Sequence, residues 1–502
     1  MSLVTNFLSL FKHDTTDDAD LNSNFDIDTA LNENWDKIDA GVKKLNDEKV
    51  SKDGNKVLSE KNFTGDYETK LKGIATGAQV NVLEGLTLDG KAISISGKKS
   101  EIKDAEVTNA RKSTIKNKTF SNVAARIEEL EEDVDNIEAV RGHIYGVRRK
   151  ITNNTSTAWE RIKDSVGLVA NATKNGGTVV NNFDDLAPWS EIKSCNYDIE
   201  TGKVKAWFGD ATFNFDGSNG DVFTYIPDVY LKIYQEDDYD YILLSDIPRS
   251  GFTKYDSFFI ARYAGSVVDD KLHSYSGLAP TVSKTIAQFR TLARALGDKF
   301  SLLDYRYFII QMLYLVEYAN YNSQSMLGNG VMSIAWDNKW DGLSAGGCDS
   351  LGMKSGCLVN DGKNSVIYRG IENPYGNMWQ FVDGITVVDR IAYICKDHSQ
   401  YADSKTASPY KKLGYVNGDT SGWTKNLGFD PDEPLARFPV EIGGSSSAGT
   451  GDYYYQNTGT RLAHVGGNFY DGANDGFWYW YLVGDFSFSG VSTGCRLLID
   501  NQ

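Results

Sequence analysis

The composition of this chain changes sharply near Gly142, and the change limits what each part can fold into. Residues 46–115 are polar, rich in Lys, Gly, Asn, Ser and Thr, and almost free of aromatic residues, whereas aromatic residues are frequent beyond Gly142. A segment with so few large apolar side chains has almost no core of its own. We therefore expect a folded region beyond Gly142 and, before it, a fibrous region in which copies of the chain bury one another.

Five parts follow from this division and from the length of 502 residues, which predicts roughly two to four folded domains. They are an attachment segment (1–45), a fibrous shaft (46–115), a coiled coil (116–150), an intermediate β-rich domain (151–250) and a larger head (251–502). The expected fold class is α+β for the head, carried on the N-terminal shaft.

Apolar residues between 120 and 137 follow the 3-4-3-4-3 spacing of a coiled-coil seam. They are Phe120, Val123, Ile127, Leu130, Val134 and Ile137. Acidic residues between them would form the outside of the coil. A single amphipathic helix packed on a domain is the alternative. The seam does not distinguish two strands from three, and the fibrous context favours a parallel homotrimer.

The first 45 residues contain a short amphipathic pattern. The residues at helical spacing are Ile27, Ala30, Leu31, Asn34 and Ile38. A helix this small cannot bury its apolar face alone, so we expect it to dock on another protein, and a partly disordered N-terminus is the alternative. Within the shaft, residues 86–97 alternate around Asp89 and Gly90 as a β-hairpin does.

Strand and helix signals both occur in the folded region. Runs at 203–208, 222–234 and Phe258–Tyr263 read as strands. Thr285 and Gln288 form a capping-box pattern that opens a helix, which Gly297 would end. Asp304 is expected to cap a second helix. The remainder is rich in Gly and loops, so we expect an α+β domain whose surface loops carry the function.

Composition and spacing exclude several classes of protein. A net charge of -16 argues against binding to nucleic acid. No run of 18 apolar residues and no export signal occur. We therefore expect that the chain is made in the cytoplasm and does not insert into a membrane. The five cysteines (195, 348, 357, 395 and 495) lack zinc-site spacing and favour reduced, buried thiols, although Cys348 and Cys357 could be bridged.

The stretch from Gly466 to Gly494 has the composition of a binding surface. It is rich in aromatic residues, Gly, Ser and Asn, and contains no Lys, Arg, Glu, Gln or Met. Antibody paratopes share this bias, because Tyr and Trp give rigid contact area and small polar residues adapt. The alternative to a binding surface is a buried β segment, because residues 477–482 alternate as a strand does, and a half-buried strand would combine the two. We expect Trp478, Trp480 and Leu482 inside, and Phe477, Tyr479 and Tyr481 outside.

Several segments resemble a known family. Phe258–Tyr263, Tyr368–Phe381 and Gly494–Leu497 resemble the C-type lectin fold in its formylglycine-generating-enzyme-like branch. Residues 313–330 resemble the same domain in tail proteins of phages of Gram-positive anaerobes, and residues 25–39 and 70–82 are similar to attachment and shaft segments of phage tail fibres. The resemblance implies a receptor-binding tail protein of a phage, or of a phage-derived bacteriocin, located at the tail tip or baseplate of the virion.

The terminal stretch also resembles the variable region of proteins that retroelements diversify. In that case it implies that residues encoded by randomised codons contact the receptor, with Trp478 and Trp480 as fixed scaffold. The implied receptor contacts are Tyr470, Asp471, Asp475, Phe477, Tyr479, Tyr481, Val483, Asp485, Phe486, Phe488 and Ser492. The implied partners are a glycan or protein of the host cell surface and, through residues 1–45, a baseplate or tail protein.

The chemistry of related proteins is not visible in this chain. Enzymes of the branch need two closely spaced cysteines, and near the matching region only Cys495 occurs. The motifs of calcium-dependent lectins do not occur, and the acidic run 430–434 favours a solvated loop. We expect no enzyme, metal or cofactor. A tail-tip enzyme acting on host wall or surface glycan is the alternative, because two distant carboxylates need no local motif; a structural baseplate component is another.

Overall fold

The computed structural model describes residues 142–501 except Asp337 and Asp341, and only short pieces before them. These pieces are residues 87–88, 91–92, 112–113, 118–119, 121, 124–127 and 129. The chain divides into two compact units, Met1–Glu128 and Glu129–Gln502. The predicted attachment segment, most of the shaft and most of the coiled-coil seam lie outside the described residues.

Short strands are described in the first unit. β1 (Thr87–Leu88) pairs antiparallel with β2 (Lys91–Ala92), which confirms the hairpin predicted for this segment. β3 (Lys112–Ser113) pairs with β4 (Lys118–Thr119), and residues 124–127 and 129 are helical. Because β4 and the later β5 (Ile144–Lys150) are strands, the bounds of 116–150 predicted for the coiled coil are too wide at both ends.

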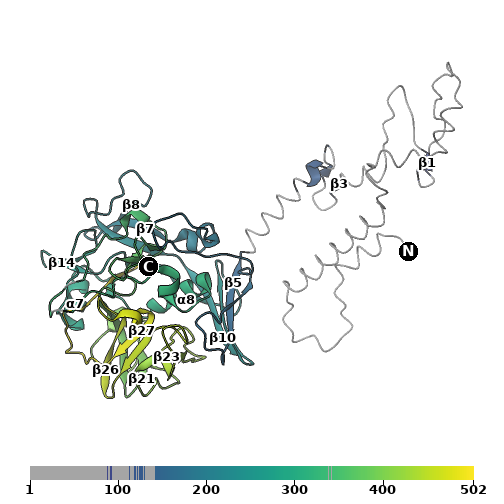
Figure 1. Ribbon diagram of the computed structural model, residues 1–502. Coiled ribbons are helices and arrows are strands. Elements are labelled where there is room, and N and C mark those ends of the chain that lie inside the picture. Colours follow the sequence, from purple (N-terminus) through teal and green to yellow (C-terminus); the bar gives the residue numbers. More distant parts are fainter. Residues whose placement is uncertain are drawn as a thin grey trace. The chain divides into compact units, whose positions relative to one another are not determined.

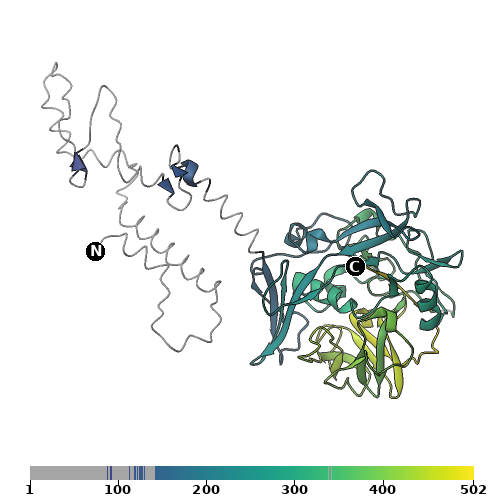
Figure 2. The same ribbon diagram turned by 180° about the vertical axis from the view of Figure 1, so that it is seen from behind.

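The second unit is rich in strands and contains three main sheets (Figures 1 and 2). The first has the order β12-β10-β11-β5-β6. Its other strands are β6 (Glu160–Lys163), β10 (Val229–Glu236), β11 (Tyr239–Ser245) and β12 (Thr253–Tyr255). The second has the order β16-β29-β13-β9-β7-β8. It comprises β7 (Lys193–Asp198), β8 (Lys203–Trp207), β9 (Asp221–Ile226), β13 (Phe258–Ala261), β16 (Phe300–Leu302) and β29 (Leu497–Asp500).

The third sheet has the order β22-β21-β20-β26-β27-β25-β23-β24, and β28 (Thr493–Gly494) adds to β20 in parallel. Its strands are β20 (Trp379–Val388), β21 (Ile391–Ile394), β22 (Lys411–Lys412), β23 (Gly422–Leu427), β24 (Pro439–Ile442), β25 (Tyr453–Gln456), β26 (Thr460–Gly466) and β27 (Gly476–Leu482). Smaller pairings join β14 (Ser266–Val268) to β15 (Lys271–His273), and β17 (Gly356–Cys357) to β18 (Val366–Tyr368) and β19 (Ile371–Glu372). The predicted strands at 203–208, 222–234 and 258–263 are confirmed, with a break between β9 and β10.

The helix α8 (Tyr307–Tyr318) lies between the first and third sheets, and every residue in it is buried (Figure 1). On one side it faces β5 and β11, and on the other Phe308 packs against Trp480 with ring centroids 5.3 Å apart. A helix that is apolar on nearly all sides needs such burial all round. The main core of the unit therefore surrounds α8. No helix in the described part of the chain is long and apolar enough to cross a membrane.

Of the two predicted helix starts, that of α7 (Ile286–Arg294) is confirmed and that of α8 is not. Helix α7 has the predicted capping box, in which Thr285 Oγ1 accepts from Gln288 N and Gln288 Oε1 accepts from Thr285 N. Asp304 does not cap α8, which begins at Tyr307 after Arg306. Instead the carboxylate of Asp304 accepts from the backbone N and the guanidinium of Arg306, so a buried ion pair takes the place of the predicted cap.

The domain boundary predicted at residue 250 is wrong. β9 and β13 lie on opposite sides of it and are neighbours in the second sheet, where Phe259 pairs with Tyr225. Asp240 of the first sheet forms a buried ion pair with Arg437, which lies beyond the boundary. Residues 151–250 and 251–502 belong to one compact unit because these pairings cross between them.

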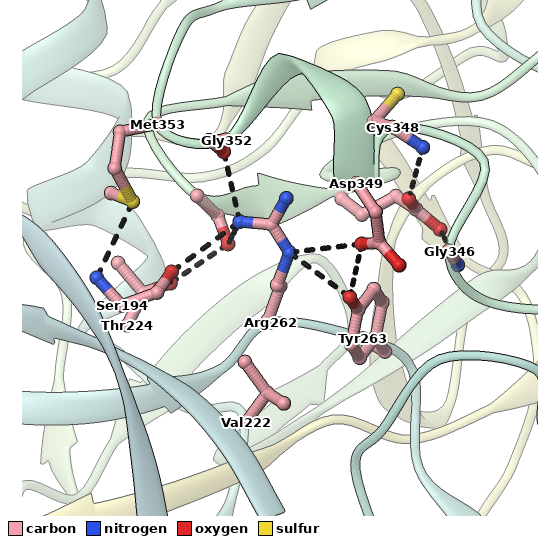
Figure 3. A network of polar contacts seen from close by, with 12 residues as sticks. Ser194, Val222, Thr224, Arg262, Tyr263, Gly346, Cys348, Asp349, Gly352 and Met353 are labelled. Carbon is pink, nitrogen blue, oxygen red and sulfur yellow. Dashed lines mark hydrogen bonds and ion pairs between the residues drawn. The ribbon is translucent and has the colours of Figure 1, made fainter. Parts of the chain in front are cut away.

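Two buried arginines join segments that lie far apart in the sequence. Arg496 donates to the carbonyl oxygens of Ala261, Arg262, Glu372 and Asn373 and to Gln380 Oε1, at 2.7–3.1 Å. Figure 3 shows Arg262 between Ser194 and Gly352 on one side and Tyr263 and Asp349 on the other. Within the described part of the chain the guanidinium of Arg496 forms no ion pair with a carboxylate, and burial lowers its pKa to about 10. These contacts fix β13, β29 and the segment before β20 to one another.

Candidate functional site

Aromatic rings line one face of the third sheet. They are Trp423 of β23, Tyr453 and Tyr455 of β25, Tyr481 of β27 and Phe488 of the loop after β27, and we call them the aromatic row. Neighbouring centroids along the row are 5.6, 4.9, 5.9 and 6.2 Å apart, in the order just given. All five side chains are half-buried. Each ring is thus held by its neighbours and still has surface open to solvent.

The pairing of strands explains why these rings share a face. Trp423 is the register partner of Tyr453, and Tyr455 is the partner of Tyr481. Paired residues lie on the same side of a sheet, and alternate residues of a strand lie on opposite sides. Tyr454, between the two row tyrosines, is fully buried against the core, together with its partner Trp480. One face of the sheet therefore packs on the core and the other carries the row.

Strand β27 confirms part of the predicted alternation. Trp478, Trp480 and Leu482 are buried and Tyr481 is half-buried, as predicted. Phe477 is fully buried, which contradicts the prediction. The register moves from Val465↔Trp480 to Gly466↔Gly476, so β27 bulges between these pairs and the regular alternation is lost. The ring of Phe477 consequently packs on Tyr314 of α8, with centroids 4.9 Å apart.

Tyr479 lies on the face of the sheet that was predicted for it, but it is also fully buried. Its ring lies 4.5 Å from that of Trp379, and the loop that precedes β27 adds Asp471 and Asp475 to its surroundings. Burial first, and then the negative charges of these two carboxylates, raise the pKa of Tyr479. Strand periodicity predicts which face a side chain takes, but it does not predict that a loop folds over that face. The loop covers Tyr479 although its side chain lies on the predicted face.

The structure divides the eleven predicted contact residues into two groups. Asp475, Phe477, Tyr479 and Ser492 are buried, which contradicts their predicted contact with a receptor. Tyr470 and Asp485 are exposed, and Asp471, Tyr481, Val483, Phe486 and Phe488 are half-buried. Tyr481 and Phe488 belong to the aromatic row. The remaining accessible residues lie in the loops before and after β27.

Tyr470 forms a second aromatic group with Trp336, and both rings are exposed, at 40% and 44%. Their centroids are 4.8 Å apart, and both rings contact the buried ring of Phe469. Tyr470 belongs to the loop that precedes β27, the strand that carries Tyr481, so this pair is a second exposed aromatic group next to that strand in the chain.

A neutral histidine lies beside the row on the same face of the sheet, because His464 is the register partner of Tyr481. His464 of β26 is fully buried, and its ring centroid lies 5.4 Å from Tyr481, 5.2 Å from Phe488 and 4.7 Å from Phe381. Burial lowers the pKa of His464 to about 3, so the imidazole is uncharged at neutral pH. It acts as a flat packing group between the two row residues and the core.

Three carboxyl groups lie close to the start of β27: Asp471 and Asp475 belong to the loop before it, and Asp452 lies just before β25. Burial raises the pKa of Asp471 to about 6 and raises those of Asp452 and Asp475 well above their ordinary value. Asp452 Oδ2 accepts from Trp478 N at 2.7 Å. A Cβ at Gly476 would lie 2.1 Å from Asp452 Oδ1, so only glycine fits there. Both oxygens of Asp475 are fully buried, which favours its protonated form.

A separate polar cavity of about 400 Å³ opens at the start of α8. Arg306, His398 and Asp500 line it, and the carboxylate of Asp500 contacts both of the other side chains. His398 and Arg306 overcome the effect of burial and lower the pKa of Asp500 to about 2. A glycosidase acid needs a raised pKa, so Asp500 does not suit that role. No cluster of three His, Cys, Asp or Glu side chains suitable for a metal was found within the described ranges.

Sequence reasoning missed Trp423, Tyr453 and Tyr455. The run Tyr453-Tyr454-Tyr455 carries a strand signal, and its alternation would put the outer two tyrosines on one face. Nothing in that pattern shows that β25 pairs in parallel with β27, or that β23 lies on its other side.

The fold and the site thus define a β-rich globular unit that presents a continuous row of aromatic rings on one sheet. No known protein family and no curated protein matches the sequence.

Proposed function

We propose that this protein is the receptor-binding tail protein of a phage, or of a phage-derived bacteriocin, and that the aromatic row contacts the host surface. The observation that carries the proposal is the row itself, because five half-buried rings stand on a sheet whose other face is firmly packed. Aromatic rings held in this way give large contact area at small entropic cost, whether the partner is a glycan or a protein.

The three segments that resemble the C-type lectin fold support the same proposal. Arg496 binds carbonyl oxygens of β13 and of the segment before β20, so segments far apart in the chain meet at one side chain. In the proposed lectin-like head this contact sets the position of β20, and β26 and β27 follow next to it in the sheet. The head therefore provides a rigid support for variable loops.

A retroelement that diversifies this protein would act on its accessible positions. We infer that these are Tyr470, Asp471, Tyr481, Val483, Asp485, Phe486 and Phe488. Substitution of the buried Asp475, Phe477 or Tyr479 would disturb the core, so these three belong with Trp478 and Trp480 as scaffold. In a homotrimer, three such surfaces on one stalk would turn weak single contacts into firm attachment.

The proposal is tested by binding of the labelled full-length chain to intact cells of a panel of candidate hosts. A variant with Tyr455→Ala and Tyr481→Ala removes two row rings, and we expect binding to fall about tenfold or more, because truncated interface tyrosines often cost about 1–2 kcal/mol each. The matched control is Tyr234→Ala with Tyr241→Ala, a half-buried tyrosine pair stacked at 4.7 Å on the first sheet. The control should bind as the wild type does.

Other outcomes point elsewhere. Equal losses, or none, in the two folded variants would show that the row is not the receptor site. Absence of binding across the panel would overturn the adhesin function and favour a structural baseplate component. Release of soluble fragments from purified host wall would favour the tail-tip enzyme.

A further inference from the structure

Four exposed valines gather on the segment that follows β6. They are Val166, Val169, Val179 and Val180, and we call them the valine patch. Val166 and Val180 are 67% and 65% exposed, so the fold of the single chain leaves most of each side chain in contact with solvent. Single exposed valines need no explanation, but four in one short segment form an apolar surface that a partner would cover.

The backbone brings the two ends of this segment together. Ala170 bridges Asn181 in antiparallel fashion, Val169 N donates to Asn182 Oδ1 at 2.7 Å, and Asn182 N donates to Val169 O at 2.8 Å. Residues next to a bridged pair point to the opposite side from that pair. Ala170 is buried, so Val169 and Val180 share the outward side.

The patch lies close to Ile144, the first residue of strand β5. Asp164 N donates to Ile144 O at 3.0 Å, and Asp164 Oδ2 accepts from Ile144 N at 2.7 Å. Val166 follows two residues later, with its N donating to Lys163 O at 3.1 Å. Strand β5 begins at Ile144, only a few residues after the heptad seam that ends at Ile137.

We propose that the valine patch is a contact between copies of this chain, at the point where three heads meet around the axis of a homotrimer. The inference rests on the parallel trimeric stalk of the proposed function. In a parallel coiled coil formed by the predicted seam, the helices would be about 8–10 Å apart, which would bring the residues that follow the seam in each copy close to the axis. Residues beside Ile144 then face the same residues of the neighbouring copies, and the valines bury one another.

The test is disulfide formation between copies of the full-length chain that carry Val180→Cys or Val166→Cys. All five native cysteines are free and buried, so the new thiol is the exposed one. Under mild oxidation at low micromolar protein, we expect either variant to give a linked pair of chains at least tenfold faster than Val416→Cys. Val416 is a matched control, because it is 46% exposed on a loop outside the patch. Proximity in the trimer gives an effective thiol concentration of order mM.

One thiol per copy can link at most two of the three copies, so a trimer leaves one chain in three unlinked, whereas a dimer would be linked completely. Linking no faster than that of the Val416→Cys control overturns the proposal. The rate of disulfide linking is measured without cells and does not depend on cell binding. A protein that binds cells without linking overturns this inference alone, and a protein that links without binding overturns only the adhesin function.

Discussion

At the scale of single residues, Asp471 makes the accessible surface sensitive to pH. Burial raises its pKa from 3.8 to about 6 against the effect of a hydrogen bond from Asn468. A carboxyl group whose pKa is raised on folding stabilises the fold at acid pH, and that contribution is lost as the pH rises through about 6. The cost of ionised Asp471 therefore applies at neutral and alkaline pH.

We predict that Asp471→Asn raises the free energy of unfolding at pH 8 by about 1–2 kcal/mol and changes it little at pH 4, since a shift of one pKa unit corresponds to about 1.4 kcal/mol. Urea unfolding at the two pH values measures the difference. Asp485→Asn is the control, because Asp485 is exposed and hydrogen bonds from Ser487 lower its pKa. That variant should gain nothing at pH 8. An equal gain at both pH values for Asp471→Asn would contradict the assignment of the effect to ionisation.

At the scale of secondary-structure elements, α7 is stabilised by its capping box. Thr285→Ala removes the hydroxyl that accepts from Gln288 N, and we expect a loss of about 1 kcal/mol in the free energy of unfolding. Thr291→Ala makes the same change on the exposed side of the same helix, where the hydroxyl only donates to Ala287 O within the helix. It should be neutral or slightly stabilising, because Ala has the higher helix propensity. Denaturant titration of both variants measures the contrast, and equal losses would show that the cap is not the cause.

The sequence predicts α7 well because its signals are local. Thr285 and Gln288 are three residues apart, and their hydrogen bonds close within one turn. The aromatic row depends on non-local pairing. Periodicity assigns Tyr481 to a face, but it cannot show that Tyr455 pairs beside it or that a loop covers Tyr479. Phe477 was misplaced for the further reason that a bulge breaks the alternation of β27.

At the scale of the whole molecule, the second unit depends on contacts that cross residue 250. The composition of the chain changes near Gly142, and this change is visible in the sequence. Residue 250 falls between two strand-rich regions that sequence alone treats as separable. The structure shares a sheet between them through β9 and β13, and α8 packs against β5 and β11. Neither region therefore has a complete core by itself.

We predict that a fragment of residues 251–502 does not fold, whereas a fragment of residues 142–502 does. The shorter fragment leaves β13 without β9, uncovers the side of α8 that faces β5, and deprives the buried Arg437 of Asp240. Removing one partner of a buried ion pair alone costs about 3–5 kcal/mol, a large part of the stability of an ordinary domain. Thermal unfolding followed by circular dichroism should show one cooperative transition for residues 142–502 and none for residues 251–502. A cooperative transition in the shorter fragment would show that the contacts across residue 250 join two self-sufficient domains, and the boundary predicted from the sequence would then be restored.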